Sequence, residues 1–266
     1  MTFFYQYLSF FFIYFFVLYL NKYSFIELEF VLFCLLGFLI NMYYWFFDII
    51  IESTYFGRYN RKIRSSILFG FFLFLISEIM LFSGFFWSYF DRIFHLSTYT
   101  FNSSQLNGFE IINWFNVPYI ATIVLLTSGY YLNLSYYYLR YNSYYSKSYL
   151  LLTILLAYFF LSLQLEEYKE LTFSISDNVY CSLFFLLTGF HGMHVLVGTI
   201  FLVTSYERLT FSHFSNSRNL GFSIALIYWH FVDIIWILLF IVVYILNNLQ
   251  NDCSFFLNDH FIICKY

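Results

Sequence analysis

Seven separate apolar runs, each long enough to help cross a bilayer, dominate this chain. A membrane-spanning helix needs about 20 predominantly apolar residues. Runs of this kind occupy residues 3–20, 30–51, 66–90, 118–140, 149–165, 180–205 and 222–247. Hydrophobic residues make up 62% of the sequence and charged residues only 10%, whereas a soluble domain carries about 25% charged residues. We therefore predict an all-α, polytopic membrane protein with seven transmembrane helices.

The loops between these runs differ in charge according to the side of the membrane. On the N-terminal side, loops 52–65, 141–148 and 206–221, with Arg140 at a helix end, hold eight basic and two acidic residues. The opposite side holds four basic and ten acidic residues. Basic loops remain on the cytoplasmic or matrix side of a membrane. The count therefore predicts that the N-terminus lies inside and the C-terminus outside.

Local signals support several helix features. Pro118 falls in the first turn of the fourth span, where its missing N–H does no harm. Ser176 and Asp177 precede the sixth span and are expected to cap it. Gly189 and Gly192, inside the sixth span, are expected to allow a neighbouring helix to approach closely.

The four cysteines divide into two groups. Cys34 and Cys181 lie in or beside apolar segments and are expected to be buried, inert thiols. Cys253 and Cys264 lie in the C-terminal tail, and their spacing matches no zinc or redox signature. A disulfide between this second pair stays open.

Codon bias and the N-terminal sequence both favour an organelle. The chain holds 41 Phe and 28 Tyr but one Pro, a balance typical of a very AT-rich genome. The first run shows neither the basic region nor the cleavage site of a signal peptide, and no Arg-rich presequence is visible. We therefore expect a protein made inside the organelle.

Five titratable side chains lie deep within the predicted spans: Glu78, His191, His194, His230 and Asp233. Counted from the inner ends of their helices at about 1.5 Å per residue, Glu78, His194 and Asp233 share one level roughly 17 Å deep. Isolated polar groups are unfavourable at that depth. We therefore expect these groups to satisfy one another, at least in part, where the helices pack.

More than one role is open for these residues. His191 and His194 are three apart on one helix face, a spacing that suits a metal or haem ligand pair. No further Cys, His or carboxylate cluster accompanies them, which favours a hydrogen-bonded structural pair. Glu78 is either a proton carrier, since buried carboxyls have raised pKa values, or a protonated structural group.

Charged residues near the inner interface suggest a second kind of site. Asp48 lies beside Trp45, a combination typical of an interfacial anchor or a lipid-headgroup contact. The basic cluster from Arg58 to Arg64, which includes Arg61, suits an anionic lipid. The same cluster is also the ordinary charge signal of an inner loop. No phosphate loop, nucleophile elbow, dinucleotide fingerprint or nucleic-acid motif occurs, so no nucleic-acid partner is expected.

Several sequence blocks together resemble subunit III of mitochondrial cytochrome c oxidase. They lie at 44–57 (Y-W-F-F-D-I-I-I-E-S-T-Y-F-G), 74–87 (F-L-I-S-E-I-M-L-F-S-G-F-F-W), 163–195 and 221–236, with weaker support at 116–129. The most specific segments are T-G-F-H-G-M-H-V, which ends the third block, and W-H-F-V-D-I-I-W, which ends the fourth. The resemblance covers about 40 to 247.

The chain also departs from the family pattern. The usual N-terminal His and Pro motif is missing, and loop 91–117 lacks a Trp-Pro-Pro run. Ser223 and Ile51 stand where the family has Glu and Arg, and Arg58 with Tyr59 stands where it has a His pair.

The resemblance implies a non-redox core subunit of the proton-pumping terminal oxidase that passes electrons from cytochrome c to oxygen. Haem a and copper are then expected in subunits I and II, with no catalytic residue, cofactor or metal in this chain. The chain would stabilise subunit I, support proton uptake, and contact accessory subunits as well. Its helices would divide two plus five around a cleft that holds phospholipid, cardiolipin or similar.

The resemblance also implies positions for sites and ends. The expected lipid-binding residues are Asp48, Glu52, Ser53, Thr54, Arg58 and Arg61. Residues 1–247 would form the membrane domain in the mitochondrial inner membrane, with the N-terminus in the matrix. Residues 248–266 would form an extension on the intermembrane-space side.

Two other functions stay open. An independent proton- or ion-coupled transporter would use Glu78 and the intramembrane histidines as a relay. The spans show no inverted repeat and no Gly/Pro-broken helix pair, features typical of such transporters. The equivalent subunit of a bacterial or quinol oxidase is the third possibility.

Overall fold

The computed structural model of the protein describes residues 28–99, 114–139, 141, 143–214 and 219–246. Within these ranges the chain is helical and contains no strand, which confirms the all-α prediction. Six helices are long and apolar enough to cross a membrane. The first predicted span, 3–20, and the tail 248–266 lie outside the described residues.

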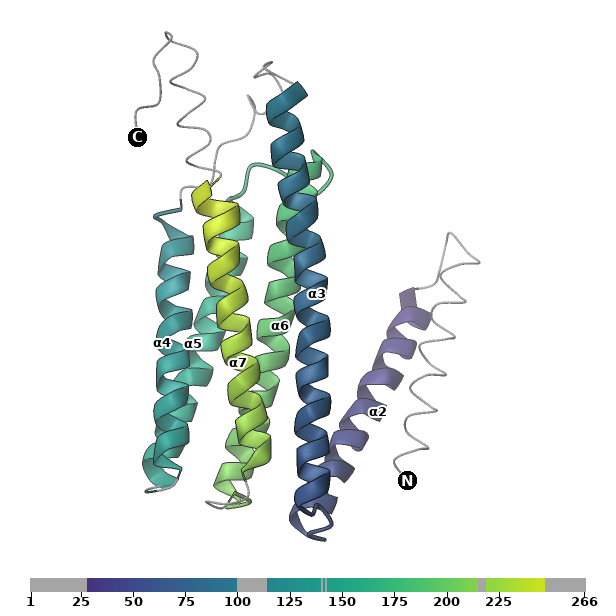
Figure 1. The fold of residues 1–266 in the computed structure, drawn as a ribbon, viewed down its shortest axis with the longest axis vertical. Coiled ribbons are helices and arrows are strands. Elements are labelled where there is room, and N and C mark those ends of the chain that lie inside the picture. Colours follow the sequence, from purple (N-terminus) through teal and green to yellow (C-terminus); the bar gives the residue numbers. More distant parts are fainter. Residues whose placement is uncertain (1–27, 100–113, 140, 142, 215–218, 247–266) are drawn as a thin grey trace. The chain divides into compact units, whose positions relative to one another are not determined.

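The helices follow the predicted spans in order (Figure 1). They are α2 (Leu28–Thr54), α3 (Arg61–Tyr99), α4 (Val117–Tyr138), α5 (Ser143–Glu170), α6 (Val179–Thr210) and α7 (Leu220–Leu239), continued by the π-helical segment η1 (Phe240–Ile245). The chain divides into two compact units, residues 1–67 and residues 68–266. The first unit contains α2 and the start of α3, and the second contains the rest of α3 with α4 to η1.

Several helices extend past the predicted spans because helical hydrogen bonding continues beyond the apolar stretch. Helix α5 begins at Ser143 and ends at Glu170, whereas the apolar run predicted only 149–165. Its last turn carries Lys169, a cation that favours a helix C-terminus. Helix α4 has Pro118 in its first turn, as predicted.

The predicted caps of α6 are wrong by one to two residues. The N-cap is Asn178, whose side-chain oxygen accepts a hydrogen bond from the Val179 N–H at 2.6 Å. Asp177 instead accepts hydrogen bonds from the Ser174 backbone N–H at 2.6 Å and hydroxyl at 2.7 Å. These two donors lower the pKa of Asp177. Asp177 therefore stabilises the loop that precedes α6, and Asn178 caps the helix.

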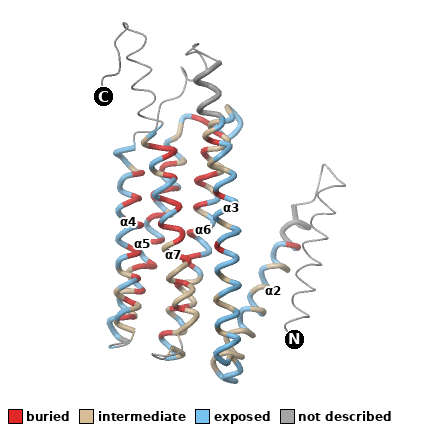
Figure 2. Tube along the Cα trace, viewed as in Figure 1, coloured by how far each residue is buried: buried red, intermediate tan, exposed pale blue. Residues whose placement is uncertain are grey.

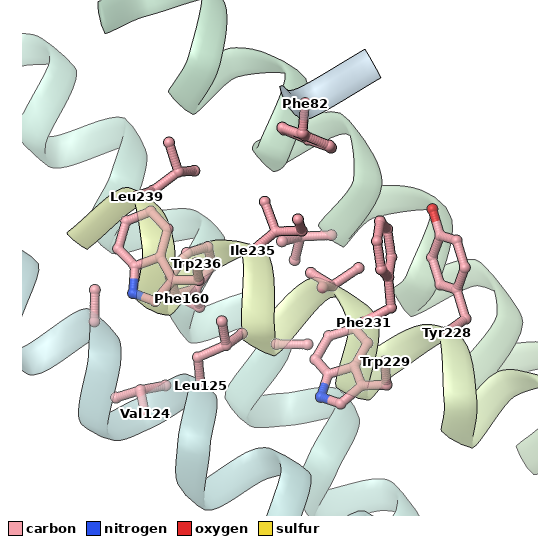
Figure 3. Packing of buried hydrophobic residues seen from close by; sticks show 14 of the residues in the cluster. Phe82, Val124, Leu125, Phe160, Tyr228, Trp229, Phe231, Ile235, Trp236 and Leu239 are labelled. Carbon is pink, nitrogen blue, oxygen red and sulfur yellow. The ribbon is translucent and has the colours of Figure 1, made fainter. Parts of the chain in front are cut away.

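The core of the second unit lies where α4, α5, α6 and α7 face one another. Figure 2 shows buried residues gathered on these helices. The largest fully buried side chains include Trp229 and Trp236 of α7 and Phe160 of α5. Trp229 donates its indole N–H to the Ser128 hydroxyl of α4 at 2.9 Å, so its polar atom is satisfied inside the core. Figure 3 shows these aromatic rings packed with Leu125 and Val124 of α4.

Helix α3 joins this bundle through long side chains. Its Phe74 stacks on Tyr228 of α7 with ring centroids 6.4 Å apart. Toward the other end, Phe85 contacts Phe190 of α6 at 5.1 Å. Phe82 of α3 is fully buried, which places one face of the helix in the core.

Close approach of α6 and α7 depends on a glycine other than the predicted ones. A Cβ atom on Gly198 would lie 3.0 Å from the Trp229 ring and 3.3 Å from the Tyr228 ring. Gly189 and Gly192 have no atom within 4 Å of an added Cβ among the described residues. Among the described residues, the prediction that Gly189 and Gly192 allow a close helix contact is therefore wrong, since the tight contact lies at Gly198, about two turns further along α6.

Replacing Gly198 by Ala is expected to destabilise the bundle. The new methyl group would push against Trp229, which is fully buried and cannot move freely. Overpacking of this kind costs about 1–3 kcal/mol. The measurement is the thermal unfolding midpoint of the full chain in detergent. Gly192→Ala is the matched control, with open space at its Cβ, and equal midpoints for the two variants would contradict the packing described here.

Candidate functional site

The predicted lipid-binding residues lie at the C-terminal end of α2 and in the turn that follows it, all within the first unit. Asp48 and Glu52 are one turn apart on α2, and both are partly exposed. The hydroxyls of Ser53 and Thr54 donate to the Ile50 carbonyl at 3.0 and 2.6 Å. The hydroxyl oxygens can still accept a hydrogen bond, while the two carboxylates provide negative charge.

The turn between α2 and α3 presents basic side chains outward. Gly57 has a positive φ of 59°, a conformation that glycine adopts without strain at a helix end. Arg58 and Arg61 follow, and both side chains are exposed. Arg58 stacks over the Phe56 ring, with its guanidinium carbon 5.0 Å from the ring centroid. Burial and the neighbouring carboxylate of Glu52 together raise the pKa of Tyr59.

Glu78 and His194 form a direct contact in the second unit. Glu78 Oε2 of α3 lies 2.9 Å from His194 Nε2 of α6, and both side chains are mostly shielded. The Phe82 ring lies edge-on to the imidazole at 5.2 Å and covers the contact. Two of the deep polar residues therefore satisfy each other across two helices.

A backbone carbonyl fixes the protonation pattern of this pair. His194 Nδ1 lies 2.7 Å from the Phe190 carbonyl oxygen, which can only accept, so Nδ1 carries a proton. The Nε2 contact then contains one further proton, shared between His194 and Glu78. Either Glu78 is a neutral acid beside a neutral ring or a carboxylate beside an imidazolium. The pair has no net charge in both cases, which suits a low-dielectric environment.

A second contact ties α4 to α7. His230 Nε2 of α7 lies 3.0 Å from the Asn133 side-chain oxygen of α4. His230 Nδ1 lies 3.5 Å from Asp233 Oδ2 on the next turn of α7. Both ring nitrogens therefore face oxygen atoms, and an imidazolium ring would donate to each and neutralise the Asp233 carboxylate. A Cβ on Gly129 would lie 2.5 Å from Asp233 Oδ2, so only glycine leaves room for this carboxylate.

The deep polar residues thus form two separate pairs rather than one network. Glu78 with His194 joins α3 to α6, and His230 with Asp233 belongs to α7 and reaches α4. His191 joins neither pair. It is fully buried, packs against the rings of Phe160 and Trp236, and has no hydrogen-bond partner on either nitrogen among the described residues.

Three polar groups escaped the sequence analysis. Asn133 lies within the apolar run of α4, and its contact with His230 identifies it as part of the polar site. Glu167 was counted as a loop acid, although its side chain is buried and accepts a hydrogen bond from Gln164 at 3.0 Å. Their positions depend on which way each helix faces, and the fourth and fifth spans are too uniformly apolar to predict that.

Arg208 is the third group, and it lies in the last turn of α6. Its guanidinium packs over the Phe214 ring at 4.6 Å, and Nη1 lies 2.5 Å from where a Cβ on Gly221 would be. No acidic partner is found for this half-buried cation among residues that the structure describes. Its position suits an anionic group from outside the chain.

The described segments contain no group of three or more His, Cys, Asp or Glu side chains arranged to hold a metal ion. Cys34 and Cys181 are free and buried, as predicted. The chemistry visible in these segments is therefore hydrogen bonding and charge pairing within a helical bundle.

Glu78→Gln is expected to preserve stability, because a Gln amide donates a hydrogen bond to His194 Nε2 without adding charge. Glu78→Leu is expected to destabilise the second unit by about 1–3 kcal/mol, since it leaves the buried Nε2 atom without a partner. The measurement compares thermal unfolding midpoints of the two variants in the same detergent. If Glu78→Leu unfolded at the same temperature as Glu78→Gln, the contact with His194 would not contribute to stability.

Comparison with known proteins places this bundle in a family. The family model described as cytochrome c oxidase subunit III matches residues 2–248. The chain is 42% identical over 207 residues to cytochrome c oxidase subunit 3 of Allomyces macrogynus, covering 77% of this chain and 76% of the relative. It is 41% identical over 219 residues to that of Lycodon semicarinatus (80% and 82% covered) and 38% identical over 207 residues to that of Ovis aries (77% and 79% covered). The chain therefore belongs to the cytochrome c oxidase subunit III family.

Proposed function

We propose that this chain is a non-redox core subunit of the terminal oxidase that passes electrons from cytochrome c to oxygen and pumps protons. The observation that carries the proposal is the family match, which extends over residues 2–248. In this proposal haem a and copper lie in subunits I and II, and the chain stabilises subunit I and supports proton uptake. The complex resides in the mitochondrial inner membrane, with the N-terminus of this chain in the matrix.

The internal pairing of the deep polar groups supports a structural role. Glu78 with His194 joins α3 to α6, whereas His230 and Asp233 both lie on α7. A relay for an independent transporter would need donors and acceptors linked from one side to the other. The Phe190 carbonyl already accepts a hydrogen bond from the remaining nitrogen of His194, so no further group among the described residues continues the path from that ring.

We further propose that the inner-side end of α2 binds phospholipid, cardiolipin or similar. Exposed Arg58 and Arg61 offer charge-assisted hydrogen bonds to a phosphate group. A basic residue near an anionic membrane surface contributes about 1 kcal/mol to such binding. Asp48 and Glu52, with the hydroxyl oxygens of Ser53 and Thr54, offer acceptors to the donor groups of a headgroup.

The proposed lipid occupies a cleft between two groups of helices, two on one side and five on the other. Arg208, half-buried without an acidic partner in the part of the chain described, is a further candidate for the phosphate of a bound lipid.

The subunit assignment is tested by affinity purification of this chain from its own membranes in mild detergent. A dithionite-reduced minus oxidised spectrum of the eluate is expected to show a haem a band, with subunit I in the same fraction. A homogeneous chain without haem and without a large partner would overturn the proposal.

The lipid site is tested by replacing Arg58 and Arg61 with Gln, singly and together. Each single change is expected to weaken binding of cardiolipin to the purified complex about fivefold, the equivalent of about 1 kcal/mol. Native mass spectrometry of the complex with added cardiolipin measures the bound lipid. Lys147→Gln, near the start of α5, is the matched control, and an equal loss in that variant would mean that only overall charge attracts the lipid.

A further inference from the structure

Four buried side chains near the outer half of the second unit carry polar atoms without hydrogen-bond partners among the described residues. They are Gln164 Oε1 and Glu167 Oε1 of α5, both nitrogens of His191 on α6, and Trp236 Nε1 of α7. Relative exposure is 5% for Gln164, 4% for Glu167, 1% for His191 and 0% for Trp236. More than nine in ten buried polar groups in proteins are satisfied, so this concentration requires an explanation.

The four side chains lie along one line of neighbouring side chains, in which Tyr244 stands between the pair His191 and Trp236 and the pair Gln164 and Glu167. The His191 and Trp236 rings are 5.0 Å apart between centroids, and the Trp236 and Tyr244 rings are 6.2 Å apart. Tyr244 in turn interacts with the Glu167 carboxyl, to which Gln164 Nε2 donates at 3.0 Å. Helices α5, α6 and α7 and the segment η1 each contribute to this line.

Aromatic rings surround the inner end of the line. Phe160 meets the Trp236 ring edge-on at 4.8 Å and the His191 ring at 5.9 Å. Figure 3 shows Phe160 beside Trp236, on the same side as Leu239. These rings keep the lipid phase away from His191, while they provide no strong acceptor or donor for its nitrogens.

The outer end of the line includes a π-helical turn. Tyr244 belongs to η1, which spans Phe240–Ile245 and continues α7. A π turn adds a residue to the helix and shifts the side chains that follow, and such turns are common at functional sites. Here the π turn carries Tyr244, which interacts electrostatically with the Glu167 carboxyl.

The chemistry of the unpartnered atoms selects the ligand. Gln164 Oε1 and Glu167 Oε1 accept hydrogen bonds, and Trp236 Nε1 donates one. His191 presents one donor and one acceptor in either neutral tautomer. A cation would satisfy only the oxygens and an anion only the N–H groups. A water molecule donates two hydrogen bonds and accepts two, and it fits where several polar atoms converge.

We propose that internal water molecules occupy this line, bound at one end by Gln164 and Glu167 and at the other by His191 and Trp236. They link α5, α6 and α7 through hydrogen bonds that the side chains do not make directly. This hydrated site is separate from the Glu78 pair and from the proposed lipid site. The inference therefore does not depend on the proposed function.

The direct test is a high-resolution structure of the intact complex that contains this chain. Ordered water density is expected within hydrogen-bond distance of a His191 nitrogen or Trp236 Nε1, and also of Gln164 Oε1 or Glu167 Oε1. Contacts made only by carbon atoms, or partners supplied by another protein segment, would overturn the proposal.

A second test separates a hydrated site from a dry one. His191→Phe keeps a ring of similar size but removes both nitrogens, so bound water and the Trp236 N–H lose a partner. The variant is expected to lose this subunit from the complex about tenfold faster at a fixed elevated temperature. If the site were dry, the same change would remove polar atoms that have no partner and would not weaken the bundle. A loss of the subunit from the complex that is as slow as in the native chain, or slower, would therefore overturn the proposal.

Phe160→Leu is the matched control for the second test. It changes the same aromatic cluster but removes no hydrogen-bonding atom, so it reports the effect of altered packing alone. The proposal requires that His191→Phe removes water density that Phe160→Leu leaves in place. Retention of that density in His191→Phe would contradict the role assigned to His191.

Discussion

The arrangement of the second unit depends on how polar groups are satisfied where the surroundings offer no water. The hydrogen bond of 2.9 Å between Glu78 and His194 is the clearest case, because it joins α3 to α6 across 116 residues of sequence. The protonation of the ring is fixed by the Phe190 carbonyl, which accepts a hydrogen bond from His194 Nδ1–H. The pair is neutral overall, and it therefore fastens α3 to the bundle without placing a charge in the apolar phase.

The same constraint explains the close contacts between helices. Gly129 leaves room for the Asp233 carboxylate between α4 and α7, and Gly198 leaves room for Trp229 between α6 and α7. Trp229 then reaches Ser128 with its indole N–H. Small residues thus serve two purposes in this bundle, since they bring helices together and make space for groups that satisfy one another.

Much of the fold could be predicted from the sequence because apolar length alone identifies a spanning helix. Six of the seven predicted spans correspond to helices in the described residues, and Pro118 marks the start of one of them. Helix ends were less predictable, since polar residues such as those that extend α5 to Glu170 continue the helix beyond the apolar run. Asn178 caps α6 in place of its neighbours because its side chain is the one that reaches the Val179 N–H.

The candidate sites were harder to predict because they depend on the direction in which each side chain points. Depth along the helices brought Glu78 and His194 to one level, and the structure places them in contact. Depth could not separate them from Asp233, which faces α4 instead, as the contact near Gly129 shows. Apolar residues surround these positions on all sides, so the sequence offers no amphipathic pattern from which to infer the facing helix.

Glu78 and His194 form a static, neutral contact that holds two helices together. The most direct test is an infrared difference spectrum of the intact oxidase, reduced minus oxidised, recorded for the native complex and for Glu78→Gln. The same carboxyl region is expected in both, because the proton shared by Glu78 and His194 remains in place as the redox centres change state. A carboxyl band present in the native complex and absent from the variant would show that Glu78 gains or loses a proton with the redox state and would contradict this expectation.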